Sequence, residues 1–81
     1  MMPVRTETVG RYKYFSVEKI GSSASGKTGI YDVVTHSGSV IGRIGWYPGW
    51  RQYVLNPAEG SFWSSGCLAD IQDCLKMLNK R

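Results

Sequence analysis

Short runs of branched and aromatic residues follow one another through the first two thirds of the chain, and glycine, serine or proline separates each run from the next. Such runs are typical of β-strands, and the separating residues favour turns. Strands are therefore predicted over residues 11–20, 30–35, 39–47 and 50–55. Residues 1–10, which have mixed polarity, are predicted to be a flexible lead-in.

The last part of the chain instead has the spacing of an amphipathic helix. Its apolar side chains recur at intervals of a helical turn: Cys67, Leu68, Ile71, Cys74, Leu75 and Leu78. Ser64 or Ser65 can cap the first turn, so a helix is predicted over residues 66–79. The two cysteines are then about two turns, or ~10 Å, apart, which is too far for a disulfide. They are expected to be reduced.

One helix with one apolar face needs one sheet to cover. The predicted fold class is therefore α+β, with residues 11–81 forming a single ββββα domain. This domain is a four-stranded antiparallel β-meander with one C-terminal α-helix packed on one face. The helix is expected to bury Leu68, Ile71, Cys74, Leu75 and Leu78 against the sheet residues Val40, Ile44, Trp46 and Tyr53.

Length and charge narrow the range of functions. A chain of 81 residues builds one small core, which excludes a Rossmann or barrel enzyme. Ten basic against six acidic residues give a net charge of +4 without a run of five like charges. This balance is compatible with a polyanionic partner and argues against an acidic mimic of DNA. No stretch approaches the ~18 apolar residues of a membrane span, and the first residues lack a secretory signal, so a cytoplasmic protein is expected.

Residues 21–28 match the phosphate-binding pattern G-x-x-x-x-G-K-[ST]. In that motif a helix follows at once, with its N-terminus directed at the phosphates. Residues 30–35 have a strand pattern instead, and so short a chain cannot supply the parallel sheet of a P-loop nucleotidase. The segment is predicted to be a mobile hairpin loop with Lys27 in solvent. Weak contact of this loop with an anion stays open.

Candidate groups for catalysis or metal binding are few. His36 is the only histidine and falls in a predicted turn, while both cysteines lie on the apolar stripe of the helix. Buried cysteines usually behave as small hydrophobic residues, and these spacings match no metal-ligand pattern. The protein is predicted not to be an enzyme and to use no metal and no cofactor.

The densest group of unusual residues is GWYPGWRQY, residues 45–53. A two-residue turn at Pro48 and Gly49 would pair Tyr47 with Trp50. Because side chains alternate along a strand, this register sorts them into two faces. The face expected to meet the helix carries Val40, Ile44, Trp46, Tyr53 and Leu55, with Arg51 at its rim. The uncovered face carries Ile41, Arg43, Tyr47, Trp50, Gln52 and Val54.

The uncovered face allows three interpretations. Its rings can simply cover the sheet, they can be hot spots of a protein interface, or they can stack on the bases of a single-stranded nucleic acid. The candidate binding residues are Lys13, Arg43, Tyr47, Trp50, Arg51 and Gln52, and Arg11, Tyr12 and Tyr14 could extend the surface. A patch this apolar on so small a protein is also expected to form a homodimer.

Residues 41–79 resemble short, mostly uncharacterised proteins encoded by bacteriophages and prophages. Those proteins share a W-[YF]-x-x-W-R-x-Y-x-[FL]-x-P hairpin, an aromatic spacer and a C-L-x-[DE]-I helix. The matching residues are Trp46, Tyr47, Trp50, Arg51, Tyr53, Leu55, Pro57, Phe62, Cys67, Leu68, Asp70 and Ile71. The resemblance implies a phage accessory protein made inside a bacterium, and it implies no activity.

Two functions are predicted as alternatives. In the first, the aromatic and basic sheet face binds single-stranded nucleic acid. In the second, the same rings bind a host protein, such as a component of a defence system, or capture a nucleotide messenger, which makes the chain an inhibitor or adaptor. The first is favoured because Arg43, Lys13 and the rings fall on predicted strands.

Overall fold

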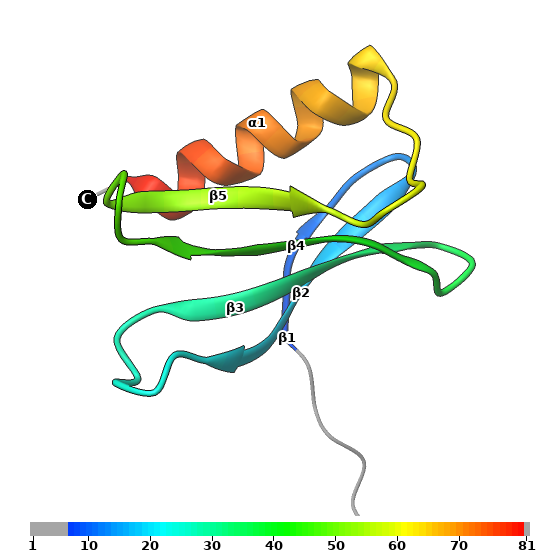
Figure 1. Cartoon of the computed structure of the whole chain (residues 1–81). Coiled ribbons are helices and arrows are strands. Elements are labelled where there is room, and N and C mark those ends of the chain that lie inside the picture. Colours follow the sequence, from blue (N-terminus) through cyan, green and yellow to red (C-terminus); the bar gives the residue numbers. More distant parts are fainter. Residues whose placement is uncertain (1–6, 81) are drawn as a thin grey trace, which may run out of the picture.

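The computed structural model describes residues 7–80 and contains one antiparallel sheet and one C-terminal helix (Figure 1). The strands are β1 (Glu7–Arg11), β2 (Phe15–Ser22), β3 (Gly29–Thr35), β4 (Val40–Tyr47) and β5 (Gln52–Pro57), and the helix is α1 (Ser65–Asn79). The strands lie side by side in chain order, β1-β2-β3-β4-β5. The α+β class and the meander are confirmed, but the sheet has five strands where four were predicted.

The additional strand comes from the segment expected to be a lead-in. Residues 7–11 pair with β2 as β1, while residues 1–6 of that prediction lie outside the described residues. A tight turn at residues 12–14, closed by a 2.8 Å hydrogen bond from the Tyr12 amide to the Phe15 carbonyl, separates the two strands. The predicted strand 11–20 is therefore wrong at its start. Gly10 makes room for this turn, because a Cβ there would lie 2.8 Å from the Tyr12 ring.

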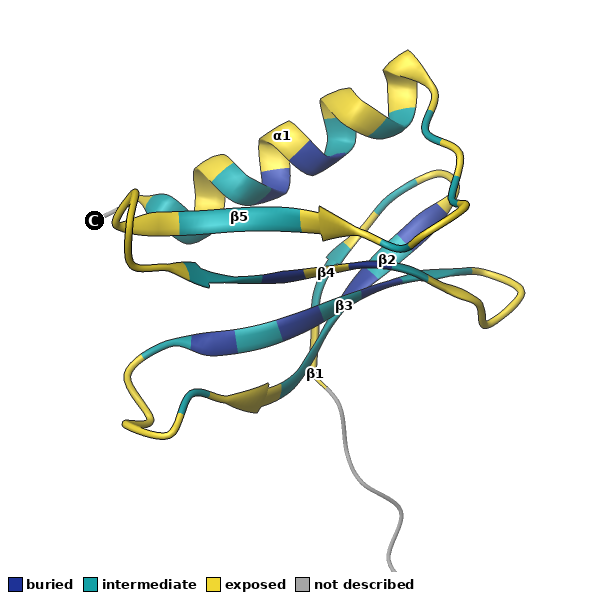
Figure 2. Cartoon of the chain, in the orientation of Figure 1, coloured by how far each residue is buried: buried dark blue, intermediate teal, exposed yellow. Residues whose placement is uncertain are grey.

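The core lies between one face of the sheet and α1, and Figure 2 shows the buried positions in the first half of β2, in the first part of β3, in the middle of β4 and on the facing side of the helix. It consists of Phe15, Val17, Tyr31, Val33, Ile44, Ile71 and Cys74. Cys67, Leu75 and Leu78 pack against it from the helix, as predicted. Leu68 does not, since 52% of it stays exposed in the groove between β5 and α1. The prediction of Leu68 as a core residue is wrong.

A β-bulge in β4 overturns two further predictions. Val33 pairs with Gly42, but Val34 pairs with Val40, so Ile41 is an extra residue on its strand. An extra residue reverses the alternation of side chains on one side of the bulge. Val40 is consequently 50% exposed, whereas Ile41 packs against the core. Their predicted faces are therefore exchanged.

The helix begins as the sequence indicates. Ser64 is the N-cap, and its hydroxyl accepts a 3.2 Å hydrogen bond from the amide of Cys67. Both cysteines are free, and burial raises the pKa of the Cys74 thiol. Within residues 7–80, α1 is too short and too polar to cross a membrane.

The exposed edge of β5 is closed by a side chain from the end of the helix. The amide of Tyr53 donates a 2.6 Å hydrogen bond to Oδ1 of Asn79, and Nδ2 of Asn79 donates to the Tyr53 carbonyl at 3.2 Å. Asn79 thus occupies the backbone groups that a neighbouring strand would use. Pro57, which has no N–H group, ends the same strand. Both features oppose pairing of this edge with another chain.

We expect Asn79→Ala to lower the free energy of unfolding by about 1–2 kcal/mol, because two hydrogen bonds to one residue are lost. Urea denaturation followed by circular dichroism measures this change. Asn56→Ala is the control, since Asn56 is an exposed residue of the same strand. Equal stability of the two variants would contradict the role assigned to Asn79.

Candidate functional site: a basic and aromatic end of the sheet

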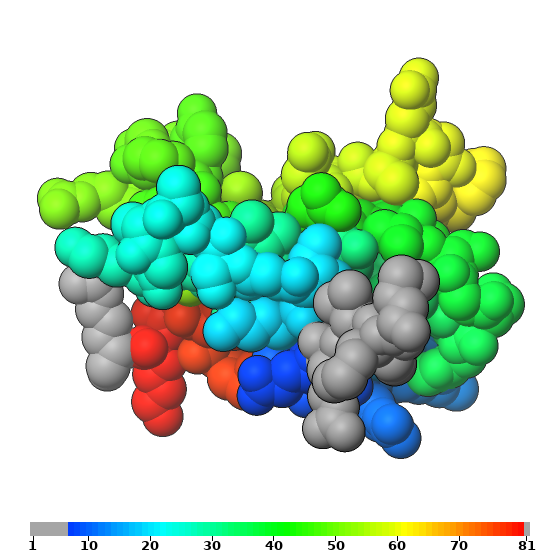
Figure 3. Space-filling view, turned by 90° about the horizontal axis from the view of Figure 1, so that it is seen from below, coloured from blue at the N-terminus to red at the C-terminus, as the bar shows by residue number. Residues whose placement is uncertain are grey.

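Three segments that are distant in the sequence meet at one end of the molecule (Figures 1 and 3). They are the β2–β3 loop (residues 23–28), the β4–β5 turn (residues 48–51) and the C-terminal end of α1. In an antiparallel meander, every second connection returns to the same end of the sheet. Lys27 and Thr28 of the loop therefore line a common hollow with Arg51 of the turn and Asn79 of the helix.

The β4–β5 turn is longer than predicted. Tyr47 pairs with Gln52, and Trp46 with Tyr53, so residues 48–51 form a four-residue loop. The Tyr47 carbonyl accepts hydrogen bonds from the amides of both Trp50, at 3.2 Å, and Arg51, at 2.8 Å. The predicted pairing of Tyr47 with Trp50 is wrong, because the chain forms a helical turn rather than a type II turn. The register differs from the prediction by two residues, which leaves each side chain of residues 43–47 and 52–55 on its predicted face.

Arg51 closes this turn with a left-handed backbone. Its φ is +54°, and among the described residues it is the only non-glycine residue with a positive φ. Such a conformation costs about 1 kcal/mol in a residue with a Cβ atom. An arginine at a position suited to glycine is consistent with a role for its charge.

The β2–β3 loop is not a phosphate-binding P-loop. It leads into the strand β3, as predicted, and not into a helix. The amides of Lys27 and Thr28 donate to the hydroxyls of Ser25 and Ser23, at 3.4 Å each, and the Ser23 amide donates to the Thr28 carbonyl at 2.8 Å. These bonds use the amides of Ser23, Lys27 and Thr28 within the loop. The charged side chain that the loop offers to an anion is therefore that of Lys27.

The aromatic residues of β4 and its turn lie on both sides of the sheet. Trp50 is 68% exposed, and its ring meets that of Tyr47 edge to face at 5.2 Å on the uncovered face. Trp46 is half-buried on the other face, where it contacts the Tyr53 ring at 5.4 Å. Trp50 and Tyr47 thus form an open platform at the tip of the hairpin, as predicted, although Trp50 is a turn residue and not a strand residue.

Basic side chains lie at the same end of the sheet as this platform. A hollow of about 420 Å³ has Lys27 and Arg51 in its lining, together with the polar side chains of Thr28, Gln52 and Asn79. On the other side of the turn, Lys76 and Trp50 line the groove between β5 and α1, which has a volume of about 620 Å³. Within the described chain, neither lining contains an aspartate or a glutamate. The end of the sheet is therefore positively charged around exposed rings.

Arg43, a predicted binding residue, is partly neutralised. Its Nε donates a 2.8 Å hydrogen bond to Oδ1 of Asp32 on the neighbouring strand, and this bond raises the pKa of the guanidinium. The pair lies in the middle of the uncovered face, where Glu18 and Thr8 continue the same row of cross-strand partners. Carboxylates in the middle of this face disfavour a path for phosphates across the sheet.

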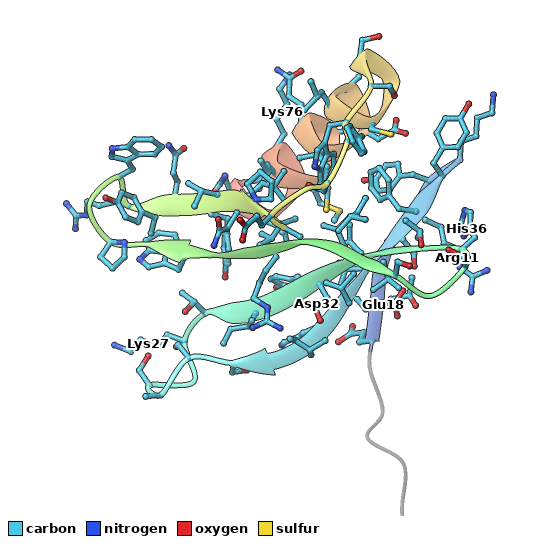
Figure 4. All side chains as sticks on the ribbon, turned by 45° about the vertical axis from the view of Figure 1, so that its right-hand side comes forward. Arg11, Glu18, Lys27, Asp32, His36 and Lys76 are labelled. Atoms are coloured by element: carbon cyan, nitrogen blue, oxygen red, sulfur yellow. The ribbon has the colours of Figure 1, made fainter. Side chains whose placement is uncertain are left out.

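Lys13, another predicted binding residue, lies at the opposite end of the molecule. Its carbonyl and that of Tyr12 are 3.0 and 3.1 Å from Nε2 of His36, in the β3–β4 turn. Figure 4 places His36 and Arg11 at this end and Lys27 at the other. The Lys13 ammonium lies 5.3 Å from the centre of the Tyr14 ring. The structure therefore brings together Tyr47, Trp50, Arg51 and Gln52, and it separates Lys13 from them.

Lys27 is the residue that sequence reasoning missed, because a lysine in a glycine- and serine-rich loop is ordinarily solvated. The predicted topology already indicated that Lys27 lies near the β4–β5 turn. Residues 21–29 and 48–49 are alternate connections of one meander, and such connections share an end of the sheet.

The groups considered for catalysis are engaged elsewhere. His36 contacts two backbone carbonyls, and Cys74 is fully buried. Among residues 7–80, no three histidine, cysteine, aspartate or glutamate side chains are grouped closely enough to hold a metal ion.

Comparison of the chain with protein-family models, with curated proteins and with solved structures finds no match. The assignment of a function therefore depends on the geometry of this end of the sheet.

Proposed function

We propose that this protein is a non-catalytic module that binds single-stranded nucleic acid at the basic and aromatic end of its sheet. The observation that carries the proposal is that the exposed ring pair of Trp50 and Tyr47 lies at the same end of the sheet as the cations Lys27 and Arg51. Bases of a single strand stack on such rings at about 1–3 kcal/mol each, while lysine and arginine contact the phosphates. Duplex bases are already stacked on each other, so the rings favour a single strand.

The resemblance to phage-encoded proteins suggests the cellular setting in which the protein would bind nucleic acid. We propose that the protein is a phage accessory protein that acts in the cytoplasm of a bacterial host. The predicted homodimer is compatible with the proposal, since pairing of two copies would double the number of stacking platforms. Light scattering at high micromolar concentration tests this association.

The test of the proposed function is a titration with an oligodeoxythymidylate of about ten nucleotides, followed by tryptophan fluorescence. We expect quenching of Trp50, and Trp50→Ala is expected to weaken binding about tenfold or more. Affinity is expected to fall steeply between about 50 and about 200 mM salt, because phosphate contacts release counterions.

Arg51→Gly is a second test variant, and it is expected to stay folded. Glycine accepts the positive φ of this position without strain, so the thermal midpoint is expected to stay equal or to rise. Binding of the oligonucleotide is expected to weaken, since one phosphate contact is lost. Absence of binding by the unmodified protein at low salt would overturn the proposal and favour a protein partner for the same rings.

A further inference from the structure

A second hollow adjoins the proposed strand-binding end, between the β2–β3 loop and the end of β4. Its volume is about 680 Å³, which lies within the range of small-molecule sites. Its lining consists of Ser23, Ser25, Lys27, Thr28, Gly29, Ile30, Arg43, Gly45, Trp46 and Pro48. This hollow and the smaller hollow by Arg51 are neighbours, because they share three lining residues: Lys27, Thr28 and Trp46.

Residue 45 adds no side chain to the hollow. Gly45 lies between Arg43 and Tyr47 on β4, and its partner on β5 is Val54. A Cβ built on Gly45 would meet no atom within 4 Å. Ile30 of β3, next to the Tyr31 that pairs with Ile44, lines the same hollow. Gly45 and Ile30 thus give the hollow a small apolar surface.

The rim of the hollow is polar and positively charged. Lys27 and the hydroxyls of Ser25 and Thr28 come from the β2–β3 loop, and Arg43 comes from β4. The ion pair with Asp32 occupies Nε of Arg43 and orients the guanidinium, while its two terminal nitrogens remain as donors. Within the described residues, the lining contains no carboxylate. An apolar floor, an indole and two cations suit a planar apolar group that carries an anion.

We propose that this hollow binds one nucleoside phosphate, with the base over Gly45 and Ile30 beside Trp46 and the phosphate at Lys27 and Arg43. The ligand can be a free nucleotide or one nucleotide of a bound strand. In the second form the inference rests on the proposed function, because the strand would pass from Trp50 over the β4–β5 turn into the hollow. The loop amides are already bonded to serine hydroxyls, so side chains hold the phosphate rather than a backbone nest.

The test uses a Trp50→Phe, Trp63→Phe variant, in which Trp46 is the single tryptophan. It is titrated with adenosine, guanosine, cytidine and uridine monophosphates, with inorganic phosphate, and with the oligodeoxythymidylate. We expect at least one mononucleotide or the oligonucleotide to change the Trp46 fluorescence and inorganic phosphate to leave it unchanged. Lys27→Ala in this background is expected to weaken binding about tenfold.

Gly45→Leu fills the hollow, and the open space at this position lets the variant fold. It is expected to weaken binding of the responding ligand at least about tenfold. Gly66→Leu, at the exposed start of α1, is the control and is expected to bind as the unmodified protein does. Thermal melting of both variants confirms that they are folded.

The outcomes separate this inference from the proposed function. Mononucleotide binding that Gly45→Leu removes supports the free-nucleotide form, even where the oligonucleotide does not bind. Oligonucleotide binding that Gly45→Leu weakens supports the strand form. Oligonucleotide binding that Gly45→Leu leaves unchanged, without any mononucleotide response, overturns the inference and leaves the proposed function standing. An equal response to inorganic phosphate overturns it as well, since the base would then contribute nothing.

Discussion

Replacing Ile71 with aspartate is expected to unfold the protein. Ile71 is 3% exposed and packs on the helix side of the core against the sheet. Its burial contributes about 2 kcal/mol, and an unpaired carboxylate in its place costs several kcal/mol more. A domain of this length has roughly 4–12 kcal/mol of total stability, so the loss approaches or exceeds the whole.

Far-UV circular dichroism and size-exclusion chromatography measure the effect of Ile71→Asp. Gln72→Asp is the matched control, because Gln72 is the next residue of α1 and is exposed. It introduces the same charge into the same helical turn and is expected to stay folded. A folded, monodisperse Ile71→Asp protein would show that α1 does not pack on the sheet as described.

Reversing two charges at the basic end is expected to remove most of the binding of single-stranded nucleic acid. Lys27 and Arg51 line one hollow from two different connections, so Lys27→Glu together with Arg51→Glu converts two phosphate contacts into two repulsions. We expect affinity to fall about 100-fold or more at low salt. The slope of log affinity against log salt is expected to decrease by about 1.4, since each lost contact to a single strand contributes about 0.7.

Arg11→Glu together with Lys13→Glu is the control for this double reversal. Each pair of changes lowers the net charge of +4 by four, but Arg11 and Lys13 lie at the other end of the molecule. The control is expected to change affinity by only a few-fold, through the overall field of the protein. Equal losses in both double variants would show that net charge, and not the basic end, attracts the nucleic acid.

Local patterns were sufficient to predict most of the elements. The apolar spacing of α1 and its serine cap depend on residues within a few positions of each other, and the structure has this helix within one residue of the prediction. The faces of residues 43–47 and 52–55 were also predicted correctly although the turn was not. Side-chain direction has a period of two, so a register error of two residues leaves both faces unchanged.

Other features depend on contacts between distant segments. The strand β1 has a weak pattern of its own and forms because β2 offers it an edge. The β4 bulge exchanges Val40 and Ile41 through pairing with β3, and no local pattern marks it. Leu68 has the spacing of a core residue, but it stays half exposed in the groove between β5 and α1.

The sequence by itself determined the helix, the approximate position of most strands and the positive charge, because each of these depends on near neighbours or on composition. The tertiary structure decided which charges share a site. It brought Lys27 to Arg51, paired Arg43 with Asp32 and placed Lys13 at the far end. The physical reason is that hairpin connections alternate between the two ends of a meander. Two connections that share an end therefore bring their side chains to one site even though a whole hairpin separates them along the chain.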